Sequence, residues 1–261
     1  MSIRPELSTD EVTRYRREGC TFVRGLLSGP ELTGLREVFD GMESANDGLV
    51  VDEFAKRLVV TRNLWQHYPD VELLVRLLGP LAAQLMKVDE VRLLDDVALV
   101  KPPRHRGGHP TVWHQDAPNF PFDRRGFLTM WIAVDDITLG QGPMTLLPGS
   151  HRLGLLGAID GGGEEIPLAS LLSEEDRAYV GEPFTTALAA GDATVHDGSL
   201  LHSAGANRTD RPRRGWGVRF IPADTLYTGG AHRSFDGLGL EPFEPFEHDD
   251  FPLIPARWRS L

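Results

Sequence analysis

The sequence contains a single cysteine, Cys20, among its 261 residues. It therefore cannot form an internal disulfide bond, and a metal site built from several thiolates is excluded. No apolar run approaches the roughly 20 residues needed to span a bilayer, and the first fifteen residues contain no hydrophobic signal core. We therefore expect a cytoplasmic protein in which histidine and carboxylate side chains bind any metal.

Positive charge is also scarce. The chain has 27 lysines and arginines against 38 aspartates and glutamates, which gives a formal net charge of −11. A general field of this sign disfavours binding to nucleic acid or to an anionic membrane. We therefore expect a small-molecule substrate as the partner, with no nucleic acid and no membrane. The sequence leaves the oligomeric state open.

The overall composition is that of a globular protein, with 41% apolar and 25% charged residues. The 28 glycines and 19 prolines are spread along the chain, which is typical of many short strands joined by turns. No repeat, low-complexity tract or linker divides the sequence. We expect one domain over residues 1–261, with a helical part at about 1–90, a barrel core at about 91–222 and a C-terminal tail at 223–261.

The first ninety residues contain helix signals. Ser8 with Glu11 and Ser28 with Glu31 match the S/T-x-x-E capping box, and apolar residues recur at helical spacing from Asp70 onward. Because proline cannot donate a backbone hydrogen bond, Gly79-Pro80 predicts a break in the third helix. The signals predict helices near residues 8–18, 29–41 and 70–87, with a short buried strand at Cys20–Val23.

Beyond residue 90 the pattern changes to short segments rich in β-branched and aromatic residues, separated by glycine and proline turns. Strands are expected at residues 91–101, 111–116, 127–134, 144–147, 184–188, 193–196 and 215–221, and one further helix at 173–179. Helices followed by a run of strands predict an α+β chain whose second part is a sandwich or barrel.

Two histidines and one aspartate stand out as candidate metal ligands. His114 and Asp116 are two residues apart in a strand-like segment, so their side chains should point to the same side. A second histidine, His202, follows a strand and opens a loop. Together they would form a 2-His-1-carboxylate triad, a typical iron site. An H-x-D triplet also occurs by chance, however, and a lone histidine is usually only hydrogen-bonded or solvent-facing.

The arginine-rich stretch from Arg208 to Arg219 admits two interpretations. It could be a solvated basic patch. In an extended strand, however, Arg213 shares a side with Gly215 and Gly217, whereas Arg214 lies on the opposite side. A guanidinium above two glycines has room for a ligand carboxylate and the shape to bind it with two hydrogen bonds.

These features resemble the phytanoyl-CoA dioxygenase family of Fe(II)/2-oxoglutarate-dependent oxygenases. The similar stretches occur in the family's order between about residues 10 and 222. They are Lys101-Pro102-Pro103, WHQD at 113–116, Phe120-Pro121-Phe122, Trp131-Ile132-Ala133, Gly142 with LPGSH at 147–151, Gly191-Asp192, and the stretch from His202 to Arg213.

The resemblance implies a fold and a set of site residues. The fold would be a double-stranded β-helix (jelly-roll, cupin-like) core with N-terminal helices packed on one sheet. His114, Asp116 and His202 match the iron ligands and so the catalytic residues, and Arg213 matches the arginine that binds the distal carboxylate of 2-oxoglutarate. Trp131 and Val97 match two further positions of the co-substrate pocket. Arg62 would replace a family lysine that also contacts the co-substrate; the alternative is that Arg62 is an exposed arginine.

One position departs from the family pattern. Relatives often have a serine two residues after the distal histidine, where it bonds the co-substrate; this chain has Ala204 there and a serine at Ser203. The departure puts one hydrogen bond in question and leaves the reaction class unchanged.

The resemblance also implies the reaction. Fe(II), 2-oxoglutarate and O₂ would together hydroxylate a small, partly apolar metabolite, such as a natural-product intermediate, with release of succinate and CO₂. The carboxylate of Asp116 argues against halogenation. Alternatives are the same iron chemistry diverted to epimerisation, desaturation or cyclisation, hydroxylation of an acyl-CoA, and a catalytically silent metal-binding barrel. Substrate-binding residues stay unassigned; Phe120, Phe122, Asp123 and Arg124 could line the entrance or only pack their loop.

Overall fold

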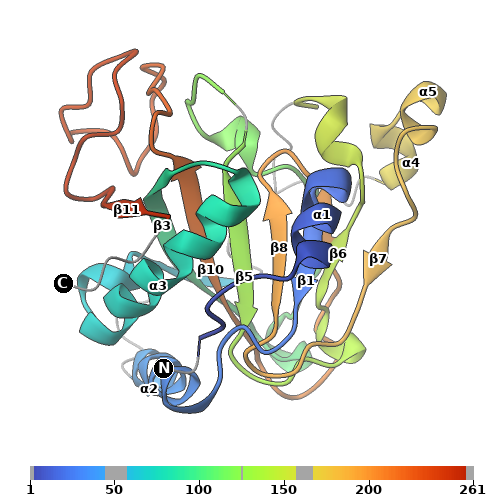
Figure 1. The fold of residues 1–261 in the computed structure, drawn as a ribbon. Helices are drawn as coiled ribbons and strands as arrows, with labels where there is room; N and C mark the ends of the chain where they lie inside the picture. Colours follow the sequence, from blue (N-terminus) through green and yellow to red (C-terminus); the bar gives the residue numbers. More distant parts are fainter. Residues whose placement is uncertain (1–2, 45–57, 125, 157–166, 257–261) are drawn as a thin grey trace.

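The computed structural model describes residues 3–44, 58–124, 126–156 and 167–256. Within these residues it contains two antiparallel sheets and several helices, so the chain has the expected α+β class (Figure 1). The helices are α1 (Thr9–Glu18), α2 (Gly29–Ser44), α3 (Pro69–Met86), α4 (Leu168–Leu171) and α5 (Glu174–Arg177). The strands are β1 (Cys20–Val23), β2 (Val59–Arg62), β3 (Glu90–Lys101), β4 (Thr111–His114), β5 (Leu128–Ala133), β6 (Met144–Leu146), β7 (Phe184–Thr185), β8 (Ala193–Asp197), β9 (His202–Ala204), β10 (Arg213–Pro222) and β11 (Leu253–Pro255).

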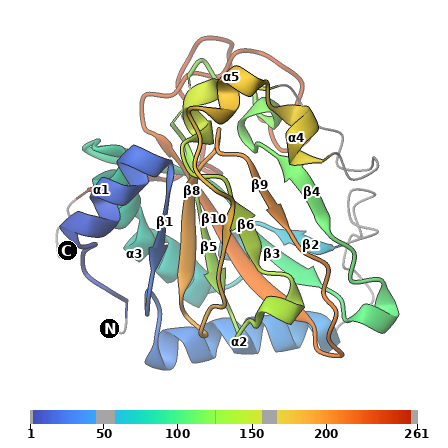
Figure 2. The same ribbon diagram turned by 90° about the vertical axis from the view of Figure 1, so that its right-hand side faces the viewer.

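The larger sheet has the strand order β1-β8-β5-β10-β3-β11, with β2 also paired to β3. The smaller sheet has the order β4-β9-β6-β7. Figure 2 shows β4, β9 and β6 in front of the larger sheet, while α2 and α3 lie on its other side. The buried side chains of α1, α2 and α3 form one apolar cluster with residues of β3, β5, β8 and β10. The N-terminal helices therefore cover one face of the larger sheet, and its other face is turned toward the smaller sheet.

Helix α1 begins and ends where the sequence predicts. The Ser8 side chain accepts a hydrogen bond from the Glu11 backbone amide, and the Glu11 carboxylate accepts one from the Ser8 amide in return. The helix ends at Gly19, whose φ of 74° is left-handed and therefore favours glycine. The predicted capping box thus fixes the start of this helix, and Gly19 fixes its end.

Helix α3 corrects one expectation, because it runs without a break from Pro69 to Met86 through Pro80. Its inward face buries apolar residues over its whole length, and this burial outweighs the local cost of one proline. Gly79 has a packing role instead. A Cβ at this position would lie 2.4 Å from the Cγ2 atom of Ile254 on β11, so the missing side chain lets helix and strand approach.

The strands largely follow the predicted segments, with three differences. The segment 111–116 is a strand only as far as His114. The segment 184–188 is a strand only at Phe184–Thr185, and its last residue, Leu188, forms an isolated bridge with Ile137. His202, expected at the start of a loop, is the first residue of strand β9. Strands β2 and β11 and helix α4 are further elements that the sequence patterns did not indicate.

Strand β10 separates two environments. Trp216, Val218 and Phe220 are fully buried in the cluster beneath the helices. Arg213 and Arg219 lie on the opposite side and line a pocket in front of the larger sheet. This is the alternation predicted for Arg213. Among the described residues, no helix is both long enough and apolar enough to cross a bilayer.

Candidate active site

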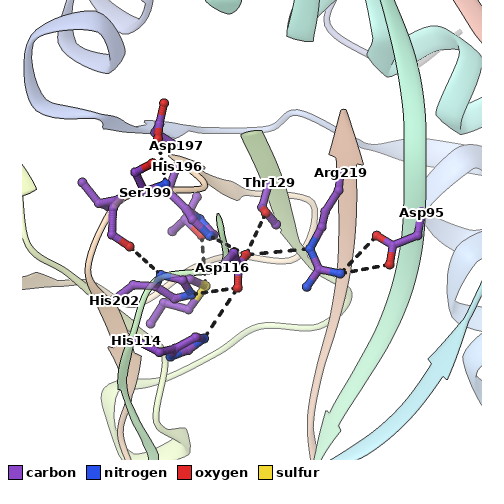
Figure 3. Close-up of polar contacts among 12 residues, drawn as sticks. Asp95, His114, Asp116, Thr129, His196, Asp197, Ser199, His202 and Arg219 are labelled. Carbon is purple, nitrogen blue, oxygen red and sulfur yellow. Dashed lines mark hydrogen bonds and ion pairs between the residues drawn. The ribbon is translucent and has the colours of Figure 1, made fainter. Parts of the chain in front are cut away.

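His114, Asp116 and His202 converge at one point between the sheets, and each offers a ligand atom within 4.8 Å of the others (Figure 3). The two histidines lie directly opposite each other in the pairing of β4 with β9. Asp116 reaches the two histidines from a turn, and not from the strand face that it was expected to share with His114. Strand β4 has ended, and Asp116 has helical backbone angles (φ −74°, ψ −38°) at the start of the 3₁₀ turn Ala117–Asn119.

Both histidine rings are oriented by backbone carbonyls. The Nδ1 atom of His114 lies 2.9 Å from the Val112 oxygen, and that of His202 lies 2.9 Å from the Leu200 oxygen. With Nδ1 donating to a carbonyl, the lone pair is on Nε2, and both Nε2 atoms face the Oδ1 atom of Asp116, at 3.7 and 3.8 Å. Burial, with His114 and His196 nearby, holds the pKa of His202 well below its usual range, so this imidazole is neutral.

The other carboxylate oxygen of Asp116 has a separate set of neighbours. Its Oδ2 atom accepts a 3.1 Å hydrogen bond from the Thr129 hydroxyl and lies 3.7 Å from both Arg219 Nε and His196 Nε2. Burial would raise the pKa of Asp116, but Arg219 and the surrounding histidines hold it well below its usual range. Asp116 is therefore an anion at neutral pH. Such a carboxylate beside two imidazole Nε2 atoms suits a divalent iron ion.

The triad opens into a cavity of about 540 Å³. The cavity brings together all seven residues named from the sequence: His114, Asp116, His202, Arg213, Trp131, Val97 and Arg62. Ser203 and Ala204 also line it, so a serine is present beside the departure from the family pattern.

Arg213 is only 3% exposed, yet no carboxylate in the described parts of the chain pairs with it. One NH group donates to the Gly142 carbonyl at 2.9 Å, and the Nε atom has no hydrogen-bond partner. Burial lowers the pKa of Arg213 to about 10, so the side chain is charged at neutral pH. A buried cation without a counter-ion fits an anionic ligand, such as the far carboxylate of 2-oxoglutarate.

The two glycines on the Arg213 face do not both leave room for a ligand. A Cβ at Gly215 would lie 1.9 Å from the Trp131 indole, so this glycine makes space for the tryptophan. The Arg213 guanidinium in turn lies over that ring, 4.9 Å from its centre. Trp131 therefore orients the arginine through a cation–π contact. Arg214 points to the other side, where it pairs with Asp135 and Asp40, as the alternation predicts.

Arg62 is held at the side of the cavity. Its NH1 atom donates to Asp95 Oδ2 at 2.9 Å, and the side chain is 31% exposed. It is therefore a pocket residue with a defined partner, not the solvent-exposed arginine that the sequence left as an alternative.

Several pocket residues were not identified as such from the sequence. Arg219 is six residues from Arg213 on β10, so strand alternation places both side chains on the same face. This alternation could have indicated Arg219 as a pocket residue. His196 lies against the triad, with its ring 4.4 Å from that of His202. Thr129 lines the cavity, and Asp95 accepts hydrogen bonds from the lining residue Arg219. Neither had a sequence signal, because their contacts depend on the pairing of β5 and β3 with β10.

The two phenylalanines that follow Asp116 in the sequence have different roles. Phe120 lines the cavity, whereas Phe122 packs against Phe127 and Phe246 in an aromatic cluster. Asp123 and Arg124 bond each other, and Arg124 also bonds Asp224, outside the cavity. Of the four residues that could have lined the entrance, only Phe120 lines the cavity.

The fold and the site define a non-haem iron oxygenase that uses 2-oxoglutarate. The family model for phytanoyl-CoA dioxygenase matches residues 3–215, so the chain belongs to that family. A relative from Stutzerimonas stutzeri, a probable alpha-ketoglutarate-dependent hypophosphite dioxygenase, is 26% identical over 230 residues, which cover 82% of this chain and 79% of that protein.

Two solved structures from nogalamycin biosynthesis are similar over almost the whole chain. The carbocyclase SnoK is 28% identical with a TM-score of 0.77, and the match covers 95% of this chain and 96% of SnoK. The epimerase SnoN, in complex with Fe³⁺, alpha ketoglutarate and nogalamycin RO, is 26% identical with a TM-score of 0.76, covering 95% and 98%. The chain is thus a 2-oxoglutarate-dependent dioxygenase whose cofactors are iron, 2-oxoglutarate and O₂.

Proposed function

We propose that the protein hydroxylates a small, partly apolar metabolite and releases succinate and CO₂. The observation that carries the proposal is the His-Asp-His triad and the uncompensated Arg213 guanidinium in one cavity. A cavity of about 540 Å³ has the size of a small-ligand site, which favours a metabolite over an acyl-CoA. The similarity to two nogalamycin enzymes supports a natural-product intermediate as the substrate.

In this proposal each pocket residue has one task. His114, Asp116 and His202 hold Fe(II), which when bound supplies the oxidative decarboxylation of 2-oxoglutarate. Arg213 binds the distal carboxylate of 2-oxoglutarate and so sets its direction in the cavity. Trp131 keeps the guanidinium in place, and Val97, at 1% exposure, excludes water from the co-substrate.

We further infer that the two sheets form a double-stranded β-helix and that residues 1–261 fold as one domain. The pairing supports the second inference. Strands β1 and β2 from the N-terminal region and β11 from the tail all pair within the same larger sheet as the core strands.

Epimerisation or ring closure by the same iron site is the second candidate function. It is favoured by the similarity to SnoK, a carbocyclase, and SnoN, an epimerase, at 28% and 26% identity over 95% of this chain. The two candidates differ in their product: hydroxylation adds one oxygen atom to the substrate, whereas the alternatives leave its oxygen count unchanged.

The proposal is tested by measuring succinate formed from 2-oxoglutarate with Fe(II), O₂ and a metabolite panel, with mass spectrometry of the products. His114→Ala and His202→Ala should abolish turnover and iron retention, and Asp116→Gly should stop hydroxylation. Variants that retain wild-type iron and activity would show that the triad assignment is wrong.

Arg213 gives a sharper test because its neighbour Arg214 is a matched control. Removing one partner of a buried charge-assisted pair should raise the KM for 2-oxoglutarate about 30-fold or more in Arg213→Ala. Arg213→Lys keeps the charge but not the forked geometry, so an intermediate KM is expected. Arg214→Ala should leave the KM near wild type, because Arg214 lies on the other face. Equal effects at both positions would contradict a specific clamp.

A further inference from the structure

Two further arginines, Arg62 and Arg219, form a second cationic group in the cavity, apart from Arg213. Arg62 and Arg219 both bond the same buried carboxylate, Asp95, which is 4% exposed. The Arg62 NH1 atom is 2.9 Å from Asp95 Oδ2, and the Arg219 NH1 atom is 3.1 Å from each Asp95 oxygen. The Nε atom of Arg219 is buried without a hydrogen-bond partner. Two guanidinium groups thus share Asp95, and Arg219 has a second carboxylate, Asp116, with Nε 3.7 Å from Oδ2.

This group is too far from Arg213 to bind the same anion. Arg213 and Arg219 are six positions apart on one face of β10, about 20 Å along a strand. Thr129, which holds Asp116, lies opposite Arg219 in the pairing of β5 with β10, whereas Trp131, opposite Gly217, contacts Arg213. The triad therefore lies near the Arg219 end. A 2-oxoglutarate that reaches from the triad to Arg213 leaves the Arg62–Arg219 end for another ligand.

The charges of the loaded site do not balance without a further anion. Among the lining residues that the structure describes, Asp116 is the only carboxylate. The two charges of Fe(II) cancel those of 2-oxoglutarate, so Arg62, Arg213 and Arg219 face only Asp95 and Asp116. One positive charge remains. Burial, together with the nearby Arg219 and Arg233, lowers the pKa of Arg62, while Asp95 opposes the shift.

The same end of the cavity has an aromatic wall. The Arg219 guanidinium lies over the Phe120 ring at 5.7 Å, and the His232 ring is 4.9 Å from that of Phe120. His232 comes from the C-terminal tail, so this segment completes the cavity opposite the strands. A flat or apolar ligand body can pack on these rings while its charged end meets the arginines.

We propose that Arg62 and Arg219 bind an anionic group of the substrate, a carboxylate or a phosphoryl group, whose apolar body packs on Phe120 and His232. The inference rests on the proposed function and adds the substrate's chemical class to it. It also reassigns Arg62 from the co-substrate to the substrate, because its guanidinium bonds Asp95 beside Arg219.

Calorimetric titration of the Fe(II)-loaded protein without O₂ tests this inference. The first titration adds 2-oxoglutarate, and the second adds three benzyl probes of similar shape: phenylacetate, benzylphosphonate and the neutral phenylacetamide. The acids should bind at least about tenfold more tightly than the amide. The more tightly bound acid shows which anion, carboxylate or phosphoryl, the subsite prefers.

The variant Arg62→Gln should weaken the binding of the acids about tenfold while leaving the amide and 2-oxoglutarate unchanged, and Arg62→Lys should be intermediate. Asp95 keeps both of its bonds to Arg219 in these variants. The control is Arg124→Gln, which removes an arginine of similar exposure that pairs with Asp123 and Asp224 outside the cavity. It should change none of the affinities.

Equal binding of the acids and the amide would overturn this inference and leave the proposed function standing. So would an Arg62→Gln variant that loses affinity for 2-oxoglutarate rather than for the acids, because Arg62 would then belong to the co-substrate. A wild-type protein that does not bind 2-oxoglutarate in the first titration would overturn the proposed function and the inference with it.

Discussion

The two oxygens of Asp116 have different neighbours, and this difference gives the residue its geometry. Oδ1 faces the Nε2 atoms of both histidines, whereas Oδ2 is bonded by Thr129 and lies near Arg219. A carboxylate held through one oxygen presents the other in a fixed direction. Groups that orient ligands in this way commonly affect metal affinity 10–100-fold.

The substitution Thr129→Val tests this orientation, because it removes the hydroxyl and keeps the shape of the side chain. We expect Fe(II) to bind about tenfold more weakly, with the fold and the affinity of the loaded protein for 2-oxoglutarate unchanged. Equilibrium dialysis against a metal chelator measures the effect. The control is Thr194→Val on the adjacent strand, whose hydroxyl lies 3.5 Å from the Met144 sulfur and does not contact Asp116. Equal iron affinity in both variants would show that the Thr129 bond does not orient the ligand.

For single residues, the sequence predicted which three side chains converge, but not the local geometry that brings Asp116 to the two histidines. The H-x-D spacing and the distant histidine bring three residues together, yet Asp116 reaches them through a turn after the strand has ended. Strand parity correctly placed Arg213 and Arg214 on opposite faces. The partners Thr129 and Asp95 could not be predicted, because their contacts depend on which strands pair with β10.

Helix α3 shows how a tertiary contact can outweigh a local signal. Its glycine and proline predict a break, but the helix continues because its apolar face packs on the sheet over its whole length. The same reason explains which elements were missed. Capped amphipathic helices and long strands have patterns of their own, whereas the short strands β2, β9 and β11 exist only through their partners.

The packing role of Gly79 predicts an unusual response to alanine. Although alanine favours helix by about 1 kcal/mol, Gly79→Ala would place a Cβ against the buried Ile254 side chain. We expect a net destabilisation of about 1–3 kcal/mol. The matched control is Gly34→Ala in α2, where the nearest atom is 4.0 Å away and a gain of up to about 1 kcal/mol is expected. Urea unfolding of both variants measures the difference, and stabilisation by both substitutions would refute the close approach.

Strand β3 contributes a pH-dependent element through Asp96, which is fully buried on the helix side of the sheet. Its carboxylate accepts hydrogen bonds from Trp216 Nε1 at 2.8 Å and from the Trp65 amide at 3.0 Å. Burial nevertheless raises the pKa of Asp96 from 3.8 to about 7. The folded state therefore binds this proton more tightly than the unfolded state. The resulting stability is fully present below about pH 4 and is lost as the pH rises through 7.

The substitution Asp96→Asn should remove this dependence. Between pH 5.5 and 7.5 the free energy of unfolding of the wild type should fall relative to the variant, by about 1–2 kcal/mol. Above pH 8 the difference between the two proteins should become constant. Urea unfolding at several pH values measures it. Parallel profiles over the whole range would show that Asp96 does not titrate between pH 5.5 and 7.5.

For the whole molecule, the charge of the cavity is opposite to that of the chain. The protein has a net charge of −11, yet four arginines line its cavity, and Arg213 is buried there without a carboxylate partner among the residues that the structure describes. Long-range attraction therefore does not bring anions to this site, and local hydrogen bonds must supply the affinity. A ligand that binds only the folded state raises the free energy of unfolding, so Fe(II) and 2-oxoglutarate should each add a separate increment.

Thermal unfolding without O₂ should resolve these increments. At a hundredfold excess over its Kd, one ligand adds about 2.7 kcal/mol, or roughly 5–10 °C in Tm for a chain of this size. We expect one increment from Fe(II) and a second from 2-oxoglutarate added to the iron-loaded protein. Arg213→Ala should keep the first and lose most of the second, whereas His202→Ala should lose both.

Magnesium is the control in this experiment, because a divalent ion can also stabilise an acidic protein by reducing the repulsion between its charges. Mg²⁺ at the same concentration should act equally on wild type and His202→Ala, whereas Fe(II) should distinguish them. If Fe(II) stabilised both proteins equally, its effect would come from the charge of the whole chain, and His202 would not bind the iron.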